Sequence, residues 1–199
     1  TDEHWEIIEA HLPPENKGPG RPIELDMRAV VNGIFYLVRT GCQWADIPKD
    51  YPVPSSIAYH YNKWKSDGTW QRINQALRIQ ERKRVDREAE PSAGSIDSQS
   101  VKTTAVPGAR GYDSGKKVNG RKRHIVVDTL GNLLEVVVHT ADIQDRDGAK
   151  LVLDKLPKST KVSLLKLWAD GGYTGKLVQW VKSNLDTMLE IVSRDPGVK

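Results

Sequence analysis

The chain has 199 residues, of which 30 are Lys or Arg and 26 are Asp or Glu, giving a formal net charge of +4. This length allows one large core or two small domains, and the mild positive charge permits a nucleic-acid partner without requiring one. The single cysteine, Cys42, excludes an internal disulfide and favours a reducing compartment. No apolar run approaches the ~20 residues that span a bilayer, and the five histidines lack zinc-type spacing.

The N-terminal part of the chain is predicted to be helical. Residues 25–40 carry the strongest pattern, with a wide apolar face and Gly41 as a stop signal. Shorter helices are predicted over 1–12 and 55–66. A further helix begins at Thr69 and continues into the highly charged segment 78–90, which we interpret as a solvated helical linker.

A short turn precedes the predicted helix 55–66, which suggests a helix-turn-helix whose second helix enters a DNA major groove. The polar side chains that would then contact DNA are Lys63 and Lys65, with Tyr59, His60 and Asn62. The alternative is a plain helical bundle whose polar face meets water or a second subunit.

Beyond residues 91–94 the pattern changes from long helices to short strands, predicted over 95–101, 124–129, 133–139, 164–169 and 188–193. Helices are predicted over 145–156 and 174–184. Three strands followed by alternating helices and strands favour a mixed β-sheet flanked by helices. We therefore predict an α+β or α/β protein with a helical DNA-binding domain plus linker over 1–90 and a mixed-sheet domain over 91–199.

Two short apolar runs are each associated with an aspartate. Asp97 lies within the first predicted strand, which we expect to be buried, and Asp170 follows the fourth and precedes Gly171 and Gly172. Ligands bind at the carboxyl ends of strands in such sheets, and two close carboxylates need a cation between them. Hard oxygen ligands favour Mg²⁺ or Mn²⁺. The alternatives are that Asp97 pairs with Lys102 or caps a turn, and that Asp170 is a local cap.

The segment between the first two predicted strands is rich in basic residues and glycine. Its basic residues are Lys102, Arg110, Lys116, Lys117, Arg121, Lys122 and Arg123. This density beside the proposed metal site is suited to a phosphodiester backbone. The alternative is a solvated basic loop.

Four further residues near these motifs have more than one interpretation. Asp142, Asp145 and Asp147 crowd the start of a predicted helix, where caps and dipole partners are commoner than metal ligands. Tyr173 could stack on an unpaired base near the cut, although core packing is the commoner role for such a residue.

Several stretches together resemble bacterial insertion-sequence transposases of the DDE type. TDEHWEIIEAHLP and RAVVNGIFYLVRTGCQWADIP are similar to the N-terminal helical domain of those enzymes. GSIDSQSVKT, GKKVNGRKRHIVVDTLG, TADIQDRDGA and WADGGYTG resemble their catalytic core, in the same order. The resemblance covers essentially the whole chain.

This resemblance implies a ribonuclease-H-like core with Asp97 and Asp170 as catalytic, metal-binding residues and two Mg²⁺ (or Mn²⁺) ions as cofactors. It implies Mg²⁺-dependent cleavage and strand transfer at element ends. The partners would be terminal inverted repeats and target DNA, bound by a homodimer or higher oligomer in the cytoplasm at the nucleoid, with no membrane. The third family acid has no match, since Glu190 lies in a strand and Asp195 in a turn. We therefore expect a C-terminally truncated chain.

Three hypotheses follow. The first is an active transposase whose final helix lies beyond this chain, and the second is a non-catalytic, transposase-derived DNA-binding protein that lacks the third acid. The third is a different nuclease on the same fold, against which the N-terminal helical domain argues.

Overall fold

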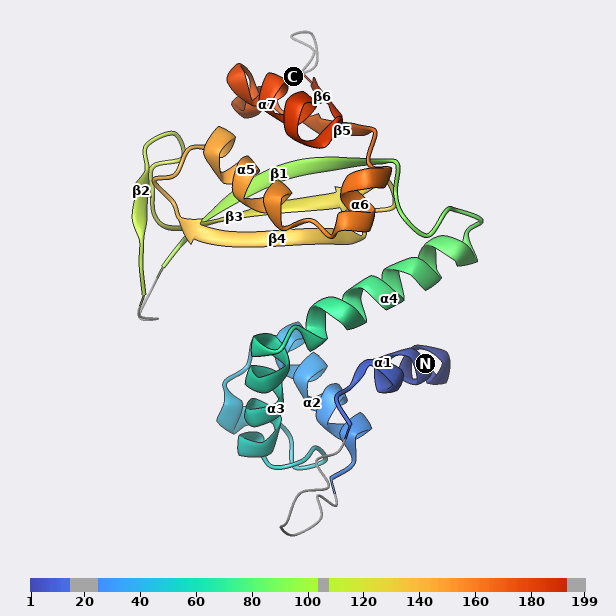
Figure 1. Cartoon of the computed structure of the whole chain (residues 1–199). Coiled ribbons are helices and arrows are strands. Elements are labelled where there is room, and N and C mark those ends of the chain that lie inside the picture. The colour runs from blue at the N-terminus through green and yellow to red at the C-terminus, as the bar shows by residue number, and fades with distance from the viewer. Residues whose placement is uncertain (15–24, 104–107, 193–199) are drawn as a thin grey trace, which may run out of the picture. The chain divides into compact units, whose positions relative to one another are not determined.

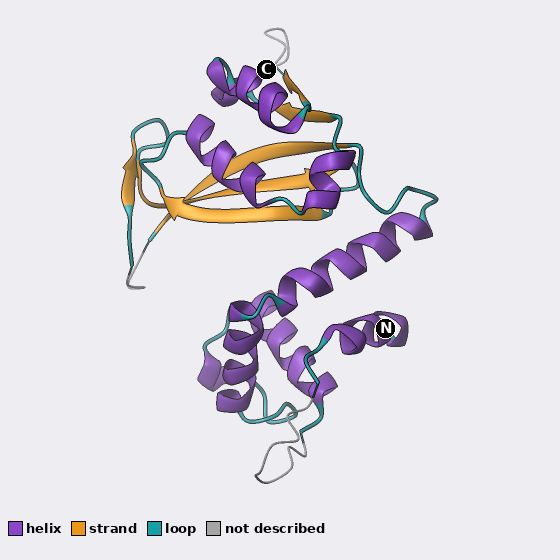
Figure 2. Cartoon of the chain, in the orientation of Figure 1, coloured by secondary structure: helices purple, strands orange, loops and turns teal. Residues whose placement is uncertain are grey.

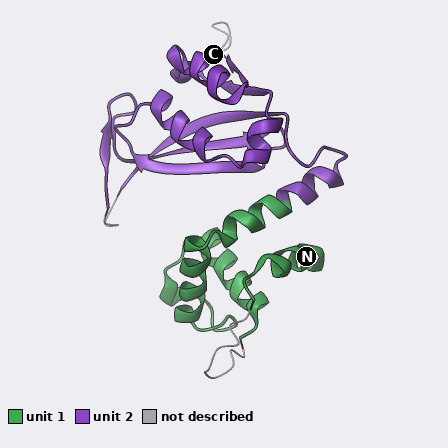
Figure 3. Ribbon diagram, in the orientation of Figure 1, with its two compact units in different colours: residues 1–77 green, residues 78–199 purple. Residues whose placement is uncertain are grey.

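The computed structural model describes residues 1–14, 25–103 and 108–192. The chain divides into two compact units, Thr1–Leu77 and Arg78–Lys199 (Figure 3). The described part of the first unit is helical, whereas the described strands belong to the second unit (Figure 2). No helix in the described ranges is both long and apolar enough to cross a membrane.

The first unit is built from helices around a small apolar core. Its elements are α1 (Asp2–His11), α2 (Met27–Thr40), the 3₁₀ helix η1 (Trp44–Asp46), α3 (Pro54–Ser66) and the first half of α4 (Thr69–Arg84) (Figure 1). The Asp26 carboxylate caps α2 by accepting from the amides of Arg28 and Ala29. Gly41 ends α2 with a φ of 68°, as its sequence position predicts. The core includes Val30, Val31 and Ile34 of α2 with Ile57 and Trp64 of α3.

The second half of α4 belongs to the second unit and is tied down by buried charges. Arg82 pairs with Asp128 at 2.6 Å, and Arg78 pairs with Glu90 at 3.3 Å. Both arginines are at most 4% exposed. The prediction of a solvated linker over 78–90 is therefore wrong for these two positions. The compact division falls within α4, earlier than the change in sequence pattern at residues 91–94.

The second unit contains a mixed sheet that, in its described residues, has six strands in the order β2-β3-β1-β5-β6, with β4 also paired to β3. The strands are β1 (Ala93–Lys102), β2 (Gly111–Asp113), β3 (Val118–Asp128), β4 (Leu133–Thr140), β5 (Lys166–Ala169) and β6 (Met188–Ile191). β3 runs antiparallel to β1, β2 and β4, whereas β5 is parallel to β1 and β6. The predicted mixed sheet is confirmed.

Helices cover one face of this sheet: α5 (Asp145–Lys155), α6 (Lys158–Ser163) and α7 (Lys176–Leu185) (Figure 1). Apolar residues of α5 and α7, among them Val152 and Val181, pack with Ile96, Val126 and Leu167 of the strands. On the opposite face Val101 and Val138 are 46% and 60% exposed. We call this second surface the open face of the sheet, meaning open with respect to the described residues.

The structure corrects the expected basic loop. Most of its described part is a hairpin, because β2 pairs with β3 from Gly111↔Gly120 to Asp113↔Val118, and β3 begins at Val118 rather than at His124. Gly120 also permits the close pairing of β3 with β1, since a Cβ there would lie 2.0 Å from the carbonyl oxygen of Val101. Residues 104–107 of the expected loop lie outside the described residues.

We predict that Arg82→Met lowers the free energy of unfolding by about 3 kcal/mol or more, because it leaves the Asp128 carboxylate buried without its charge partner. Arg84→Met is the control, since Arg84 is an exposed neighbour on the same helix and pairs with Glu81 at the surface. Urea denaturation measures both variants. Equal midpoints for the two variants would show that the buried pair does not anchor α4.

Candidate catalytic site

Asp97 lies near the middle of β1, on the open face of the sheet. β1 alternates, so that Gly94 and Ile96 are buried under the helices while Asp97 is exposed. The Asp97 Oδ1 atom accepts a hydrogen bond of 2.7 Å from the amide of Ser98. The expectation of a buried carboxylate at position 97 is therefore wrong, because the side chain points away from the covered face.

Asp170 follows β5 directly and is brought beside Asp97 by the parallel pairing of the two strands. The register runs from Ala93↔Lys166 to Ser95↔Trp168; Asp97 lies two residues further along β1, and Asp170 follows Ala169, the last residue of β5. Asp170 keeps an extended backbone, and its Oδ1 accepts a 2.9 Å hydrogen bond from the Gly172 amide. Asp170 thus caps the 3₁₀ turn η2 (Gly171–Tyr173), as the alternative interpretation required, and also stands at the edge of the sheet next to Asp97.

These two aspartates differ from three other aspartates of the unit in their charge partners. Asp113, Asp128 and Asp145 each pair with a buried Lys or Arg. In the described part of the chain, neither Asp97 nor Asp170 forms an ion pair with a basic side chain. Asp97 therefore does not pair with Lys102. Two neighbouring carboxylates without a basic partner are a donor set that suits a hard divalent cation.

A third acidic ligand does not join them within the described residues. No group of three or more Asp, Glu, His or Cys side chains there is arranged to hold a metal ion. Glu190, on β6, instead pairs with Lys166 at 2.5 Å. Asp195 lies outside the described residues.

The basic residues predicted to contact DNA divide between the two faces of β3. The β1–β3 register pairs Gln99 with Arg123 and Val101 with Arg121, so both arginines share the open face with Asp97. Lys122 points the other way, is 4% exposed and pairs with Asp113 and Asp145. Its burial corrects the prediction that Lys122 contacts DNA.

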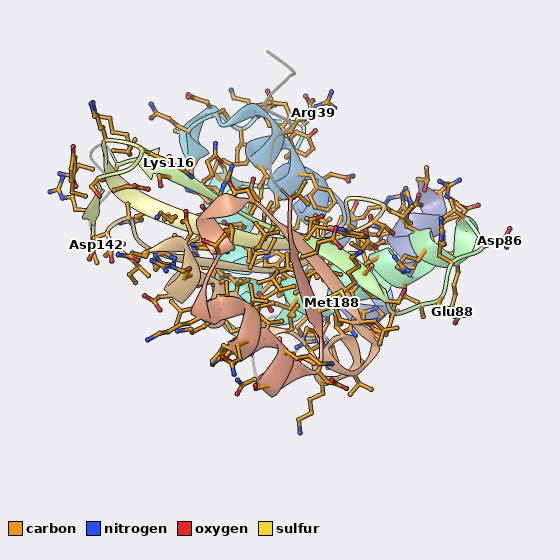
Figure 4. The ribbon with its side chains drawn as sticks, turned by 90° about the horizontal axis from the view of Figure 1, so that it is seen from above. Arg39, Asp86, Glu88, Lys116, Asp142 and Met188 are labelled. Atoms are coloured by element: carbon orange, nitrogen blue, oxygen red, sulfur yellow. The ribbon has the colours of Figure 1, made fainter. Side chains whose placement is uncertain are left out.

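The remaining basic candidates near the site are Lys102, Lys116 and Lys117, all exposed. Lys116 lies in the turn between β2 and β3 and donates a 3.0 Å hydrogen bond to the carbonyl of Ser98. Figure 4 shows the Lys116 side chain at the same end of the unit as Asp142. A polar cavity of about 380 Å³ lies there, lined by Asp113, Lys122, Asp142, Asp145, Arg146 and Gly172.

Tyr173 is buried rather than available to a base. It is 1% exposed, and its hydroxyl forms a 3.1 Å hydrogen bond with Nδ1 of His124. Burial raises the pKa of Tyr173, and the negative charges of Asp145, Asp97 and Asp170 raise it further. Tyr173 therefore packs beneath the site, and the prediction that it contacts DNA is corrected.

Sequence reasoning missed the role of Asp145. The N-cap of α5 is Gln144, so Asp145 is not the cap that its position suggested. Its Oδ1 accepts from the Ser98 hydroxyl at 2.9 Å and lies 3.0 Å from Nζ of Lys122. The sequence does carry a signal for Lys122, the ion-pair partner of Asp145. Lys122, His124 and Val126 stand at alternate positions, so all three side chains point to the inward face once β3 is recognised as a strand.

In the helical unit, the candidate DNA contacts lie on α3. Tyr59 is 59% exposed, Lys63 lies over its ring at 5.9 Å, and Lys65 and Asn62 are exposed. His60 is 8% exposed and lies against Trp64, so it is not available for a DNA contact.

The strand order and the paired aspartates define an α+β core of the ribonuclease-H-like class. Residues 88–192 match the family described as "Transposase DDE domain", and the chain therefore belongs to the DDE transposases. Residues 1–74 match the family described as "Putative transposase of IS4/5 family". An uncharacterized 16.2 kDa protein of insertion element IS402 from Burkholderia cepacia is 30% identical over 111 residues, which are 53% of this chain and 74% of that protein.

We predict that acid destabilises the second unit through His124. Burial lowers the pKa of His124 to about 4, with the nearby His139 adding to the effect. Between pH 6.5 and 4 the unfolded chain therefore binds a proton that the folded chain does not, and stability falls as the pH falls. The slope from this one group is about 1.4 kcal/mol per pH unit.

Urea denaturation at several pH values tests this. His124→Gln removes the titrating group, so the slope between pH 6.5 and 4 decreases, whereas His4→Gln, at an exposed position, leaves it unchanged. A slope that is identical in His124→Gln and the unaltered chain would refute the assignment.

Proposed function

We propose that this chain catalyses divalent-metal-dependent cleavage and strand transfer of DNA at the ends of an insertion sequence, with Asp97 and Asp170 as the metal-binding pair. The observation that carries the proposal is the parallel β1–β5 register, which brings together two aspartates that lack basic partners among the described residues. Membership of the DDE transposases supports the same chemistry.

When bound, two Mg²⁺ or Mn²⁺ ions would activate the attacking hydroxyl and stabilise the leaving oxygen. Asp97 and Asp170 would hold these ions through their carboxylates. The Ser98 and Gly172 amides each hold one oxygen of these carboxylates, which fixes the direction of the other oxygen. The reaction is in-line attack on a phosphodiester, first by water and then by the freed 3′-hydroxyl on a target strand.

The open face of the sheet is the surface on which we place the DNA backbone near the cut. Arg121 and Arg123 stand on this face across from residues of β1 that follow Asp97. Lys102 and Lys117 are exposed close to the same strands. Basic side chains around an acidic site allow phosphates to approach despite the charge of the two aspartates.

For the helical unit we propose recognition of the element ends. Tyr59 and Lys65 are exposed and Lys63 is partly exposed along α3, which follows the turn after η1 as the second helix of a helix-turn-helix would. This proposal includes a division of roles between a DNA-binding unit and a catalytic unit. It also includes assembly as a homodimer or higher oligomer on DNA and a cytoplasmic, nucleoid-associated location.

A non-catalytic DNA-binding protein derived from a transposase is the second candidate. The observation that favours it is that the described residues bring no third acidic ligand to Asp97 and Asp170. Strand cleavage by the chain separates the two candidates. A general nuclease on the same fold, the third hypothesis, is disfavoured by the match of residues 1–74 to the IS4/5 description.

We predict that Asp97→Asn and Asp170→Asn each reduce strand cleavage to background while leaving binding to element ends unchanged. The amide keeps the size of the carboxylate but loses the charge that holds the ion. Asp147→Asn is the control, because Asp147 is an exposed aspartate of the same unit and pairs with Lys150. Cleavage at the rate of the unaltered chain by either of the first two variants would rule out the metal assignment.

We also predict that neutralising Lys117, Arg121 and Arg123 together flattens the salt dependence of DNA affinity. Each lost phosphate contact changes the log–log slope by about 0.9, so three contacts change it by up to about 2.7. The exposed lysines of the helix-covered side, Lys155, Lys158 and Lys182, provide a control triple with the same loss of charge. If both triples change the slope equally, the open face is not the DNA surface.

A further inference from the structure

The carboxylate of Asp145 touches both segments that carry the proposed metal-binding pair. Its Oδ1 accepts from the hydroxyl of Ser98, the residue whose amide holds Asp97. Its Oδ2 faces Gly172, the residue whose amide holds Asp170. A Cβ at position 172 would lie 3.2 Å from Asp145 Oδ2 and 3.1 Å from Asp170 Oδ1. Asp145 therefore lies between the segment around Ser98 and the segment around Gly172.

Buried charges hold Asp145 in this position. Nζ of Lys122 lies 3.0 Å from Asp145 Oδ1 and 3.2 Å from Asp113 Oδ2. Asp113 in turn accepts a 2.5 Å hydrogen bond from the hydroxyl of Ser100. Although burial opposes ionisation, hydrogen bonds from Lys122 and Ser98 keep the pKa of Asp145 below its usual range, so the carboxylate stays charged.

The contacts of Asp145 with Lys122 and Ser98 go beyond what capping the N-terminus of α5 would require. Asp147, in the same first turn of α5, shows the ordinary arrangement, with a side chain that is 63% exposed and an i,i+3 pair to Lys150. Asp145 instead points inward to Lys122 and Ser98. Because a buried ion pair adds little stability over apolar residues of the same volume, the geometry that it fixes is the better explanation for it.

We propose that Asp145 is a positioning residue for the divalent-ion site, which holds the segments around Ser98 and Gly172 so that Asp97 and Asp170 stand at the separation a shared ion requires. This inference rests on the proposed function, since it presupposes that those two aspartates bind the ion. Asp145 acts through its two neighbours and is not itself a ligand.

The test is Mn²⁺ binding to the full chain, followed by the electron paramagnetic resonance signal of free Mn²⁺. In Asp145→Asn the side chain keeps its size, and Lys122 keeps Asp113 as a partner. We expect Mn²⁺ affinity to fall about 10- to 100-fold, as for other residues that orient metal ligands. Asp147→Asn, the matched control in the same turn, should bind Mn²⁺ like the unaltered chain, and thermal unfolding should show that both variants are folded.

Asp97→Asn separates failure of this inference from failure of the proposed function. If Asp97→Asn binds Mn²⁺ as tightly as the unaltered chain, the proposed function is wrong. If Asp97→Asn loses Mn²⁺ while Asp145→Asn binds it as tightly as Asp147→Asn does, the inference alone is wrong.

A second variant covers the case in which Asp145→Asn does not fold. Ser98→Ala removes the hydroxyl that contacts Asp145 and leaves the Ser98 backbone amide on Asp97 in place. We expect a several-fold loss of Mn²⁺ affinity. The control is Ser114→Ala, at an exposed position in the β2–β3 turn. Equal affinity in the two serine variants would overturn the inference.

Discussion

The parallel pairing of β1 with β5 is the constraint on which the site depends. Residues 73 positions apart in the sequence come to neighbouring strands because Ser95 is in register with Trp168, Asp97 lies two residues further along β1, and Asp170 directly follows the end of β5 at Ala169. A shift of the register by one residue would turn one aspartate to the opposite face. Gly94 and Leu167 are partners in the same register and are both buried. They therefore fix which face of each strand points to the core.

The two faces of β3 divide the charges of the unit between structure and function. Lys122 points inward to Asp113 and Asp145, where the pKa of Asp113 is lowered to about 2: burial opposes this, but hydrogen bonds from Ser100 and Lys122 prevail. Arg121 and Arg123 point to the open face that carries Asp97. Adjacent basic residues in one motif thus have opposite environments. The inward charges hold α5 and the β2–β3 turn against β1, whereas the outward charges lie on the open face.

Much of this arrangement could be predicted from the sequence, because the short strand pattern around Asp97 and the apolar run that ends at Asp170 are both recognisable, and a helical pattern follows the second. What could not be predicted was the facing of individual side chains. The glycine-rich, basic segment before His124 concealed the first half of β3, so Lys122 could not be separated from Arg121 and Arg123 by strand alternation. The burial of Arg78 and Arg82 was also hidden, because their partners depend on tertiary contacts with Glu90 and Asp128.

The central claim is that Asp97 and Asp170 share one divalent-ion site. Iron-directed cleavage tests it most directly, since Fe²⁺ bound in place of Mg²⁺ reduces added hydrogen peroxide to hydroxyl radicals, which cut the polypeptide backbone beside the ligands of the ion. Mapping the cuts by mass spectrometry should show scission around both residue 97 and residue 170, competed by Mg²⁺ and lost at both positions in Asp97→Asn. Cuts at one of the two strands only, or scission at residue 170 that persists in Asp97→Asn, would contradict a shared site.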